Sequence, residues 1–185
     1  MDARSAVREI VLPETTPETE WVRGRPLQKV SPTRRHAIVQ LAVAVRLRAW
    51  SRERGQVGTE WRFRITPPGE VTRPLVPDVA YVSYERLGAL PAAERETPPF
   101  APDIVVEIRS PDDRPADIGH KRDVYLAGGA ELLLLVDPDR RTMDVFGDGT
   151  AHRTYGEGDT YVSERFSGLT IVLAEIFAEL NIPSD

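Results

Sequence analysis

The chain has 185 residues, a formal net charge of −5 at pH 7 and no cysteine. A chain of this length most simply forms one domain with a core of its own, and the lack of cysteine excludes disulfides, thiolate catalysis and cysteine-bound zinc. The acidic charge argues against indiscriminate nucleic-acid binding through whole-molecule charge, although it leaves room for a local basic surface.

The N-terminal residues indicate neither export nor membrane insertion. Met1 to Arg8 contains no apolar segment of a signal peptide, and no stretch reaches the roughly 18 apolar residues of a membrane span. We therefore expect a cytoplasmic protein without membrane contact. The polar segment 1–19 is rich in Pro, Thr and Glu, which predicts a flexible arm. Residues 20–185 are expected to form a single domain.

The first elements of that domain are a hairpin and a long helix. Glu20 to Val30 predicts a short hairpin that turns at Arg23-Gly24. Ser31-Pro32 is a helix-start signal, and a helix is predicted from Thr33 to about Arg54, with Gly55 closing it. Its apolar residues at helical spacing predict the buried face: Ile38, Leu41, Ala42, Val45 and Ala49.

Alternating or continuous apolar runs, bounded by Gly and Pro, predict the remaining elements. The predicted strands are 57–66, 75–82, 104–108, 132–136 and 169–173, with a hairpin from 142–146 and 151–155. The predicted helices are a turn at 84–90, a helix at 116–127 and a closing helix at 174–180. We expect an α/β or α+β fold with a central mixed sheet flanked by helices, and the hairpin as a C-terminal extension.

Acidic residues inside two of these apolar strands are the main functional signal. Asp78 follows Pro77, and Asp103 and Glu107 flank a run of Ile and Val. Buried carboxylates are costly unless a cation, a hydrogen-bond network or a metal compensates them. Lys121 follows on the next helix, and with Lys29 it is one of only two lysines in the chain. We therefore expect a divalent-metal site in this region.

Each of these residues also has a purely structural interpretation. Asp78 could cap a turn after Pro77, and Glu107 could form an ion pair with Arg109. Lys121 could be a solvated helix residue. Asp103 shares a strand face with Glu107 by alternation, so it is either a further acid of the site or the cap at the start of its strand.

The ordered set of motifs resembles the Uma2 family. The motifs are Val-Pro-Asp78, Ala-Pro-Asp-Ile-Val-Val-Glu107-Ile-Arg-Ser-Pro, Lys121 before Tyr125, Gly128-Gly129 and Leu-Leu-Val-Asp137-Pro. The resemblance covers nearly the whole chain, and it implies a restriction endonuclease-like core of the PD-(D/E)XK nuclease type.

The resemblance also implies roles for individual residues. Asp78 and Glu107 correspond to the two metal-binding acids and Lys121 to the motif lysine, whose usual place, two residues after the second acid, is here taken by Arg109. Glu20 resembles an acid near the start of the family pattern, and His36 also lies within the region of resemblance. The expected metal is Mg²⁺ or Mn²⁺, bound by Asp78, Glu107 and the backbone carbonyl of Ile108.

Three functions remain open from the sequence. The first is a metal-dependent DNA endonuclease that hydrolyses phosphodiester bonds with Asp78, Glu107 and Lys121. The second is a catalytically inactive nuclease-fold module that binds nucleic acid or protein, which the arginine at position 109 and the acidic charge favour. The third is a structural homodimer formed through the hairpin at 142–155. The arginines of the first helix either follow a phosphate backbone or are simply solvated.

Overall fold

A central six-stranded sheet organises the structure, a computed structural model that describes residues 8–182. The strands are, in spatial order, β10 (Thr150–Gly156), β9 (Thr142–Gly147), β8 (Leu132–Asp137), β7 (Ile104–Ile108), β6 (Val79–Ser83) and β3 (Gly55–Thr59). β7 and β8 are parallel and every other neighbouring pair is antiparallel, so the sheet is mixed, as predicted.

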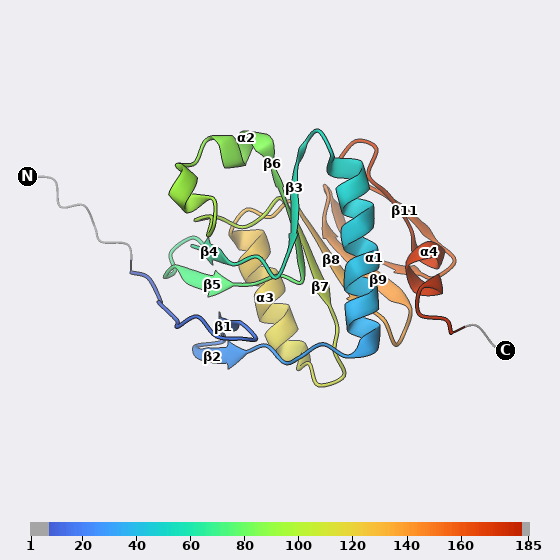
Figure 1. Cartoon of the computed structure of the whole chain (residues 1–185), viewed down its shortest axis with the longest axis horizontal. Coiled ribbons are helices and arrows are strands. Elements are labelled where there is room, and N and C mark those ends of the chain that lie inside the picture. Colours follow the sequence, from blue (N-terminus) through green and yellow to red (C-terminus); the bar gives the residue numbers. More distant parts are fainter. Residues whose placement is uncertain (1–7, 183–185) are drawn as a thin grey trace, which may run out of the picture.

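Helix α1 (Arg34–Ser51) covers one face of this sheet and helix α3 (Pro115–Ala127) covers the other (Figure 1). Side chains alternate between the two faces along each strand, so β7 contributes Ile104 and Val106 to the core under α1 and Val105 to the core under α3. The central strands are therefore buried on both sides, which explains their nearly continuous apolar sequences.

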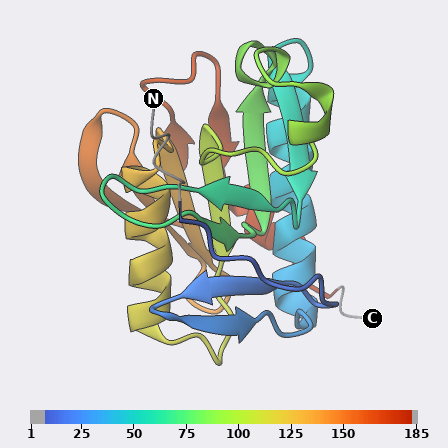
Figure 2. The same cartoon turned by 90° about the vertical axis from the view of Figure 1, so that its left-hand side faces the viewer.

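Smaller elements surround this three-layer core. They are the hairpin β1 (Thr19–Val22) and β2 (Arg25–Gln28), the pair β4 (Phe63–Ile65) and β5 (Arg73–Leu75), the pair β11 (Thr160–Val162) and β12 (Thr170–Val172), the helices α2 (Tyr84–Gly88) and α4 (Leu173–Ala178), and a 3₁₀ turn at Ala92–Glu94. Figure 2 shows the β1–β2 hairpin crossing from α3 to α1 at the lower end of the sheet. This position makes the hairpin one wall of the site described below.

The predicted buried face of α1 was right only in part: Ile38 and Ala42 pack against the core, but Leu41, Val45 and Ala49 are exposed. The helix buries Val39, Val43 and Leu47, whereas Leu41 is 65% exposed and Val45 is 55% exposed. Two neighbouring apolar stripes both have helical spacing, so periodicity alone could not choose between them. The buried stripe also contains His36, whose ring lies beside Asp78.

The end of α1 and the strand after it also differ from prediction. α1 ends at Ser51, and Gly55 begins β3, where a Cβ would lie only 2.2 Å from the carbonyl oxygen of Val82. The strand predicted over 57–66 is divided between β3 and β4, which belong to different sheets. Glu60 lies between them with φ +50°, a left-handed conformation that ends a strand.

The strand predicted over 75–82 is also divided. β5 ends at Leu75 and β6 begins at Val79, so Asp78 lies in the irregular segment between them. The predictions for β7, α3 and β8 agree with the structure within one residue, and so does the predicted turn of the first hairpin. The predicted C-terminal hairpin is β9–β10, which continues the central sheet next to β8 rather than projecting from it.

Part of the predicted N-terminal arm lies against the domain. The backbone of Ile10 donates to Thr72 (2.9 Å), and that of Thr72 donates to Arg8 (3.0 Å). Farther along the arm, Glu18 pairs with Arg62. Residues 1–7 of the arm and 183–185 of the domain lie outside the described residues. None of the helices in the described part of the chain is long and apolar enough to cross a membrane.

Candidate functional site

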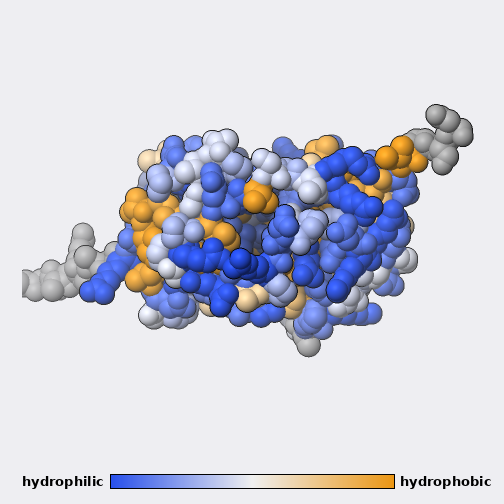
Figure 3. All heavy atoms as spheres, turned by 90° about the horizontal axis from the view of Figure 1, so that it is seen from below, coloured by the Kyte–Doolittle hydropathy of each residue, from blue (hydrophilic) through white to orange (hydrophobic). Residues whose placement is uncertain are grey.

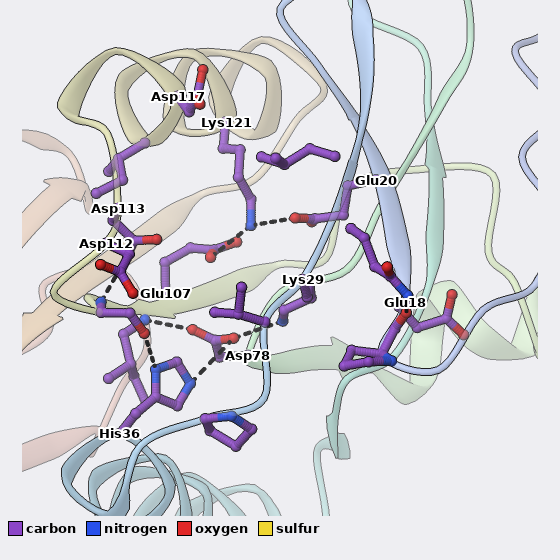
Figure 4. Close-up of a pocket in the computed structure, with 18 of the residues that line it drawn as sticks. Glu18, Glu20, Lys29, His36, Asp78, Glu107, Asp112, Asp113, Asp117 and Lys121 are labelled. Carbon is purple, nitrogen blue, oxygen red and sulfur yellow. Dashed lines mark hydrogen bonds and ion pairs between the residues drawn. The ribbon is translucent and has the colours of Figure 1, made fainter.

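A cavity of about 640 Å³ lies between the β1–β2 hairpin, the starts of α1 and α3, and the ends of the central strands. Many charged side chains line it, and six of them, from segments that are far apart in the sequence, form its centre (Figure 4): Glu20, Lys29, His36, Asp78, Glu107 and Lys121. Five of these are among the predicted catalytic and accessory residues: Asp78, Glu107, Lys121, Glu20 and His36. The structure therefore brings most of the predicted site together.

Asp78 is almost completely buried, and both of its carboxylate oxygens have partners. Oδ2 accepts a hydrogen bond from the backbone N–H of Ile108 (2.6 Å), and Oδ1 accepts one from Lys29 Nζ (2.7 Å). Burial by itself raises the pKa of Asp78, but the charge of Lys29 and the nearby His36 outweigh it and hold this pKa well below its ordinary value. Asp78 is thus a fixed anion at neutral pH.

Glu107 is in a different electrostatic state. Its Oε2 accepts a hydrogen bond from Lys121 Nζ (2.8 Å), whereas its buried Oε1 has no hydrogen-bond partner among residues 8–182. Burial, together with the negative charges of Asp78 and Glu20, raises the pKa of Glu107 to about 8 although Lys121 opposes the shift. The unpartnered oxygen gives Glu107 a free acceptor for a cation or a proton.

Lys121 reaches the cavity from α3 and is only 8% exposed. Its Nζ donates to Glu107 and to Oε2 of Glu20 (3.0 Å). Burial lowers the pKa of Lys121, but the carboxylates of Glu107 and Glu20 outweigh burial and raise it above the ordinary value. Glu20, on β1, is fixed in turn because its Oε1 accepts from the backbone N–H of Val76 (2.7 Å).

Lys29 is a site residue that the sequence reasoning missed. Its Nζ donates to Asp78 Oδ1 (2.7 Å), to Glu60 Oε2 (2.7 Å) and to the carbonyl oxygen of Val76 (3.1 Å). Burial lowers the pKa of Lys29, but the charge of Asp78 and the other acids raise it above its ordinary value. The signal was present in the composition: the chain has 22 arginines and two lysines, and both lysines lie in this cavity.

Gln40 and Glu60 were not predicted either. Gln40 Nε2 donates to Glu60 Oε1 (2.9 Å) and to the backbone oxygen of Asp78 (2.8 Å). It thereby ties α1 to both acids that hold Lys29. Neither residue stands in a motif, so nothing in the sequence alone could have pointed to them.

His36 lies in the first turn of α1, where Thr33 caps the helix. Its Nδ1 is 3.0 Å from Ser110 Oγ, and its Nε2 is 3.6 Å from Asp78 Oδ1. The ring is 8% exposed and lines the cavity. The structure thus places His36, a predicted accessory residue, beside Asp78.

Asp103 and Arg109, two predicted accessory residues, lie outside this cavity. Asp103 stands before β7, at the other end of the strand from Glu107, where it accepts from the backbone N–H of Ser83 (2.7 Å) and pairs with Arg86. The interpretation of Asp103 as a further acid of the site was therefore wrong. Arg109 points away as well, with its guanidinium 3.5 Å from Asp137, so the only ammonium at Glu107 within the described chain is that of Lys121.

The donor atoms fit a hard divalent ion. Asp78 and Glu107 provide carboxylate oxygens, Ile108 lines the same cavity, and Glu107 has an oxygen without a partner. Mg²⁺ is typically held by one or two carboxylates and water, so the types of ligand that it needs are present in this cavity. No group of three or more His, Asp or Glu residues within 8–182 is gathered closely enough to form a metal cage, because the two lysines stand between the acids.

Comparisons with known proteins support the same interpretation of the fold. The model of the Uma2 family, described as "Putative restriction endonuclease", matches residues 9–176. A crystal structure from Anabaena variabilis, described as "a putative nuclease belonging to DUF820", aligns with a TM-score of 0.78 and 24% identity, over 92% of this chain and 95% of that one. No curated protein matches the chain.

Proposed function

The chain belongs to the Uma2 family of restriction endonuclease-like proteins, and on this basis we propose that it is a metal-dependent DNA endonuclease that hydrolyses phosphodiester bonds. The observation that carries the proposal is the convergence of Asp78, Glu107 and Lys121 on one cavity. The residues come from the segment before β6, from β7 and from α3, and their order in the chain is that of the nuclease motif.

In this proposal Asp78, Glu107 and the Ile108 carbonyl hold a Mg²⁺ or Mn²⁺ ion. A bound ion of this kind lowers the pKa of a coordinated water and stabilises the negative charge that develops on the phosphate. Lys121 stays charged because of its two carboxylate partners, so it can orient the attacking water and donate to a phosphate oxygen. Glu20 acts through Lys121 by fixing the direction of the ammonium.

DNA would approach on the side where α1 and α3 begin. Figure 3 views the molecule from this side, and the surface there is mainly hydrophilic. A second hollow, of about 370 Å³, adjoins the cavity at His36 and is lined by Arg34, Arg35 and Arg109. Arginines beside an active site can hold the phosphate backbone of a substrate even when the protein as a whole is acidic.

The test is cleavage of a supercoiled plasmid in the presence of Mg²⁺ or Mn²⁺. We expect the parent chain to convert the plasmid to nicked or linear forms, and Asp78→Asn to abolish this conversion. Asp103→Asn is the matched control, because Asp103 is equally buried but outside the cavity. Unchanged cleavage by Asp78→Asn would refute the assignment of the site.

A binding module without catalysis is the second candidate. Lys29 and Lys121 already neutralise Asp78 and Glu107 without any metal, which favours it. Salt-sensitive DNA binding that does not change on addition of Mn²⁺, together with no cleavage, would support this candidate. β10 is an edge strand of the central sheet, so the predicted homodimer could pair through its free edge; sedimentation of a strict monomer would exclude it.

A further inference from the structure

Lys29 lies in an environment that resembles a cation-binding site more than a simple ion pair. Its three hydrogen bonds go to two carboxylate oxygens, from Asp78 and Glu60, and to the carbonyl oxygen of Val76. An ammonium group has three N–H donors, so every donor of Lys29 has a partner. Carboxylates and backbone carbonyls are also the oxygen ligands that hard divalent ions take.

The two lysines of the cavity divide four of its carboxylates into two halves. Lys29 joins Asp78 and Glu60, whereas Lys121 joins Glu20 and Glu107 (Figure 4 draws Lys29 to Asp78 and Lys121 to Glu20 and Glu107). Each ammonium therefore lies between two carboxylates. The halves differ in two respects: Lys29 also donates to the carbonyl oxygen of Val76, and Glu107 keeps a buried oxygen without a partner among the described residues.

The oxygen ligands of Lys29 are held by contacts that do not depend on the lysine. Gln40 donates to Glu60 Oε1 and to the Asp78 carbonyl oxygen, and the backbone N–H of Glu60 also donates to that carbonyl (3.3 Å). Asp78 Oδ2 is fixed separately by the N–H of Ile108. Removal of the ammonium should therefore leave a preformed set of oxygens rather than a collapsed one.

We propose that Lys29 is a tethered cation which occupies a position that a divalent ion would otherwise take beside Asp78. The site then binds one metal ion fewer than its oxygens could hold. The inference rests on the proposed function, because in two-metal nuclease sites two divalent ions stabilise the attacking and the leaving oxygen of the phosphodiester. Here the ammonium of Lys29 supplies the second positive charge from within the chain, and it is a positioning residue for Asp78.

The test is the number of Mn²⁺ ions bound per chain, measured by calorimetric titration of the parent and of Lys29→Met. Methionine keeps an unbranched side chain but removes the charge. We expect Lys29→Met to bind one Mn²⁺ more than the parent. Lys29→Arg, the matched control, keeps the positive charge and should bind the same number as the parent. Equal stoichiometry in the parent and Lys29→Met would overturn the inference.

The same titration separates this inference from the proposed function. The number of ions in the parent tests the proposed function, whereas the difference between the parent and Lys29→Met tests the role of Lys29. One ion in the parent and two in Lys29→Met support both the proposed function and the proposed role of Lys29. One ion in each refutes only the inference; none in the parent and one in the variant supports the inference and counts against the proposed enzyme.

Thermal unfolding provides a second readout that does not depend on activity. Without metal, Lys29→Met should be less stable than the parent, because Asp78 loses its cationic partner in a buried place. Mn²⁺ should raise the unfolding temperature of this variant more than that of the parent, since an ion that binds only the folded state stabilises it. The double variant Lys29→Met/Glu60→Gln lacks a carboxylate of the proposed position and should lose the extra stabilisation. If Lys29→Met does not fold, Lys29→Gln replaces it, because glutamine is neutral and can still donate to Asp78.

Discussion

Lys121 Nζ lies 2.8 Å from Glu107 Oε2 although the lysine belongs to α3 and the acid to β7. The usual nuclease motif has its lysine two residues after the second acid, on the same strand, and if Glu107 is that acid, as we propose, the position is taken by Arg109. Arg109 points to Asp137 instead. The ammonium therefore comes from the helix that follows the strand, which keeps an acid and a lysine together without the usual spacing.

Replacing this lysine should affect stability strongly. In Lys121→Met the carboxylates of Glu20 and Glu107 lose their shared cation while they remain buried. A loss of about 3–5 kcal/mol is expected for breaking a buried pair in this way, measured by urea unfolding. Arg122→Met is the neighbouring control. Its partner Asp123 is largely exposed, so the free energy of unfolding should change by less than about 1 kcal/mol. Similar values for the two variants would contradict the buried bridge.

The face of α1 can be tested with two leucines. Leu47 is fully buried and Leu41 is 65% exposed. Leu47→Ala should lower the free energy of unfolding by about 2–5 kcal/mol because it leaves a cavity in the core. Leu41→Ala should change it by no more than about 0.5 kcal/mol, as is usual for a surface position. If Leu41→Ala were the more damaging change, the helix would be rotated relative to this structure.

The arginines of the second hollow should control affinity for DNA without affecting the metal. Arg34→Ala and Arg109→Ala should each weaken DNA binding and lower the slope of log K against log salt by about one. Filter binding or fluorescence anisotropy at several salt concentrations measures both quantities. Mn²⁺ binding by calorimetry should be unchanged. Arg52, which caps the opposite end of α1 and is exposed, is the control position, and Arg52→Ala should leave the slope as it is.

Asp148 should make the stability of the protein fall at low pH. This buried carboxylate accepts four hydrogen bonds, from Tyr161 Oη, Ser163 Oγ and the N–H groups of Glu164 and Arg165. Burial raises the pKa of Asp148, but these hydrogen bonds outweigh it and lower the pKa below the ordinary value of 3.8.

Because the folded state binds the proton less well than the unfolded chain, the stabilisation is complete above the unfolded pKa. It is lost as the pH falls through the folded pKa. Asp148→Asn should lose about 1–3 kcal/mol at pH 7, and it should show a weaker decrease in stability below pH 4 than the parent. Urea unfolding between pH 7 and pH 2 measures both. Parallel pH curves for the two proteins would refute this role.

The correctly predicted elements are those whose ends are marked by residues close to them in the sequence. β7 and β8 are apolar runs bounded by Pro, Asp or Gly, and α3 ends at Gly128, so local signals were sufficient. The face of α1 was not determined locally, because its two apolar stripes differ only in what they meet in the folded protein. The segments around Glu60 and Asp78 interrupt the predicted strands, and both side chains contact Lys29, which is distant in the sequence. Local patterns do not record such contacts.

Only part of the candidate site was predicted, because only some of its residues stand out in the local sequence. Asp78 and Glu107 were found because acids within apolar strands are unusual at any single position. Lys29 was missed because its role depends on residues 31 and 49 positions away. No period or motif links these residues. Only the shortage of lysine in the composition pointed to it.

The backbone of Val76 contacts both halves of the site, in each case through a residue of the N-terminal hairpin or of the segment that follows it. Its N–H is bound by Glu20 from β1, and its carbonyl oxygen is bound by Lys29, which follows β2. When the hairpin packs against the rest of the domain, the carboxylate of Glu20 and the ammonium of Lys29 reach the cavity together. During folding, the site should therefore be completed in one cooperative step rather than assembled residue by residue. The Val76 amide would record that step as a slowly exchanging proton.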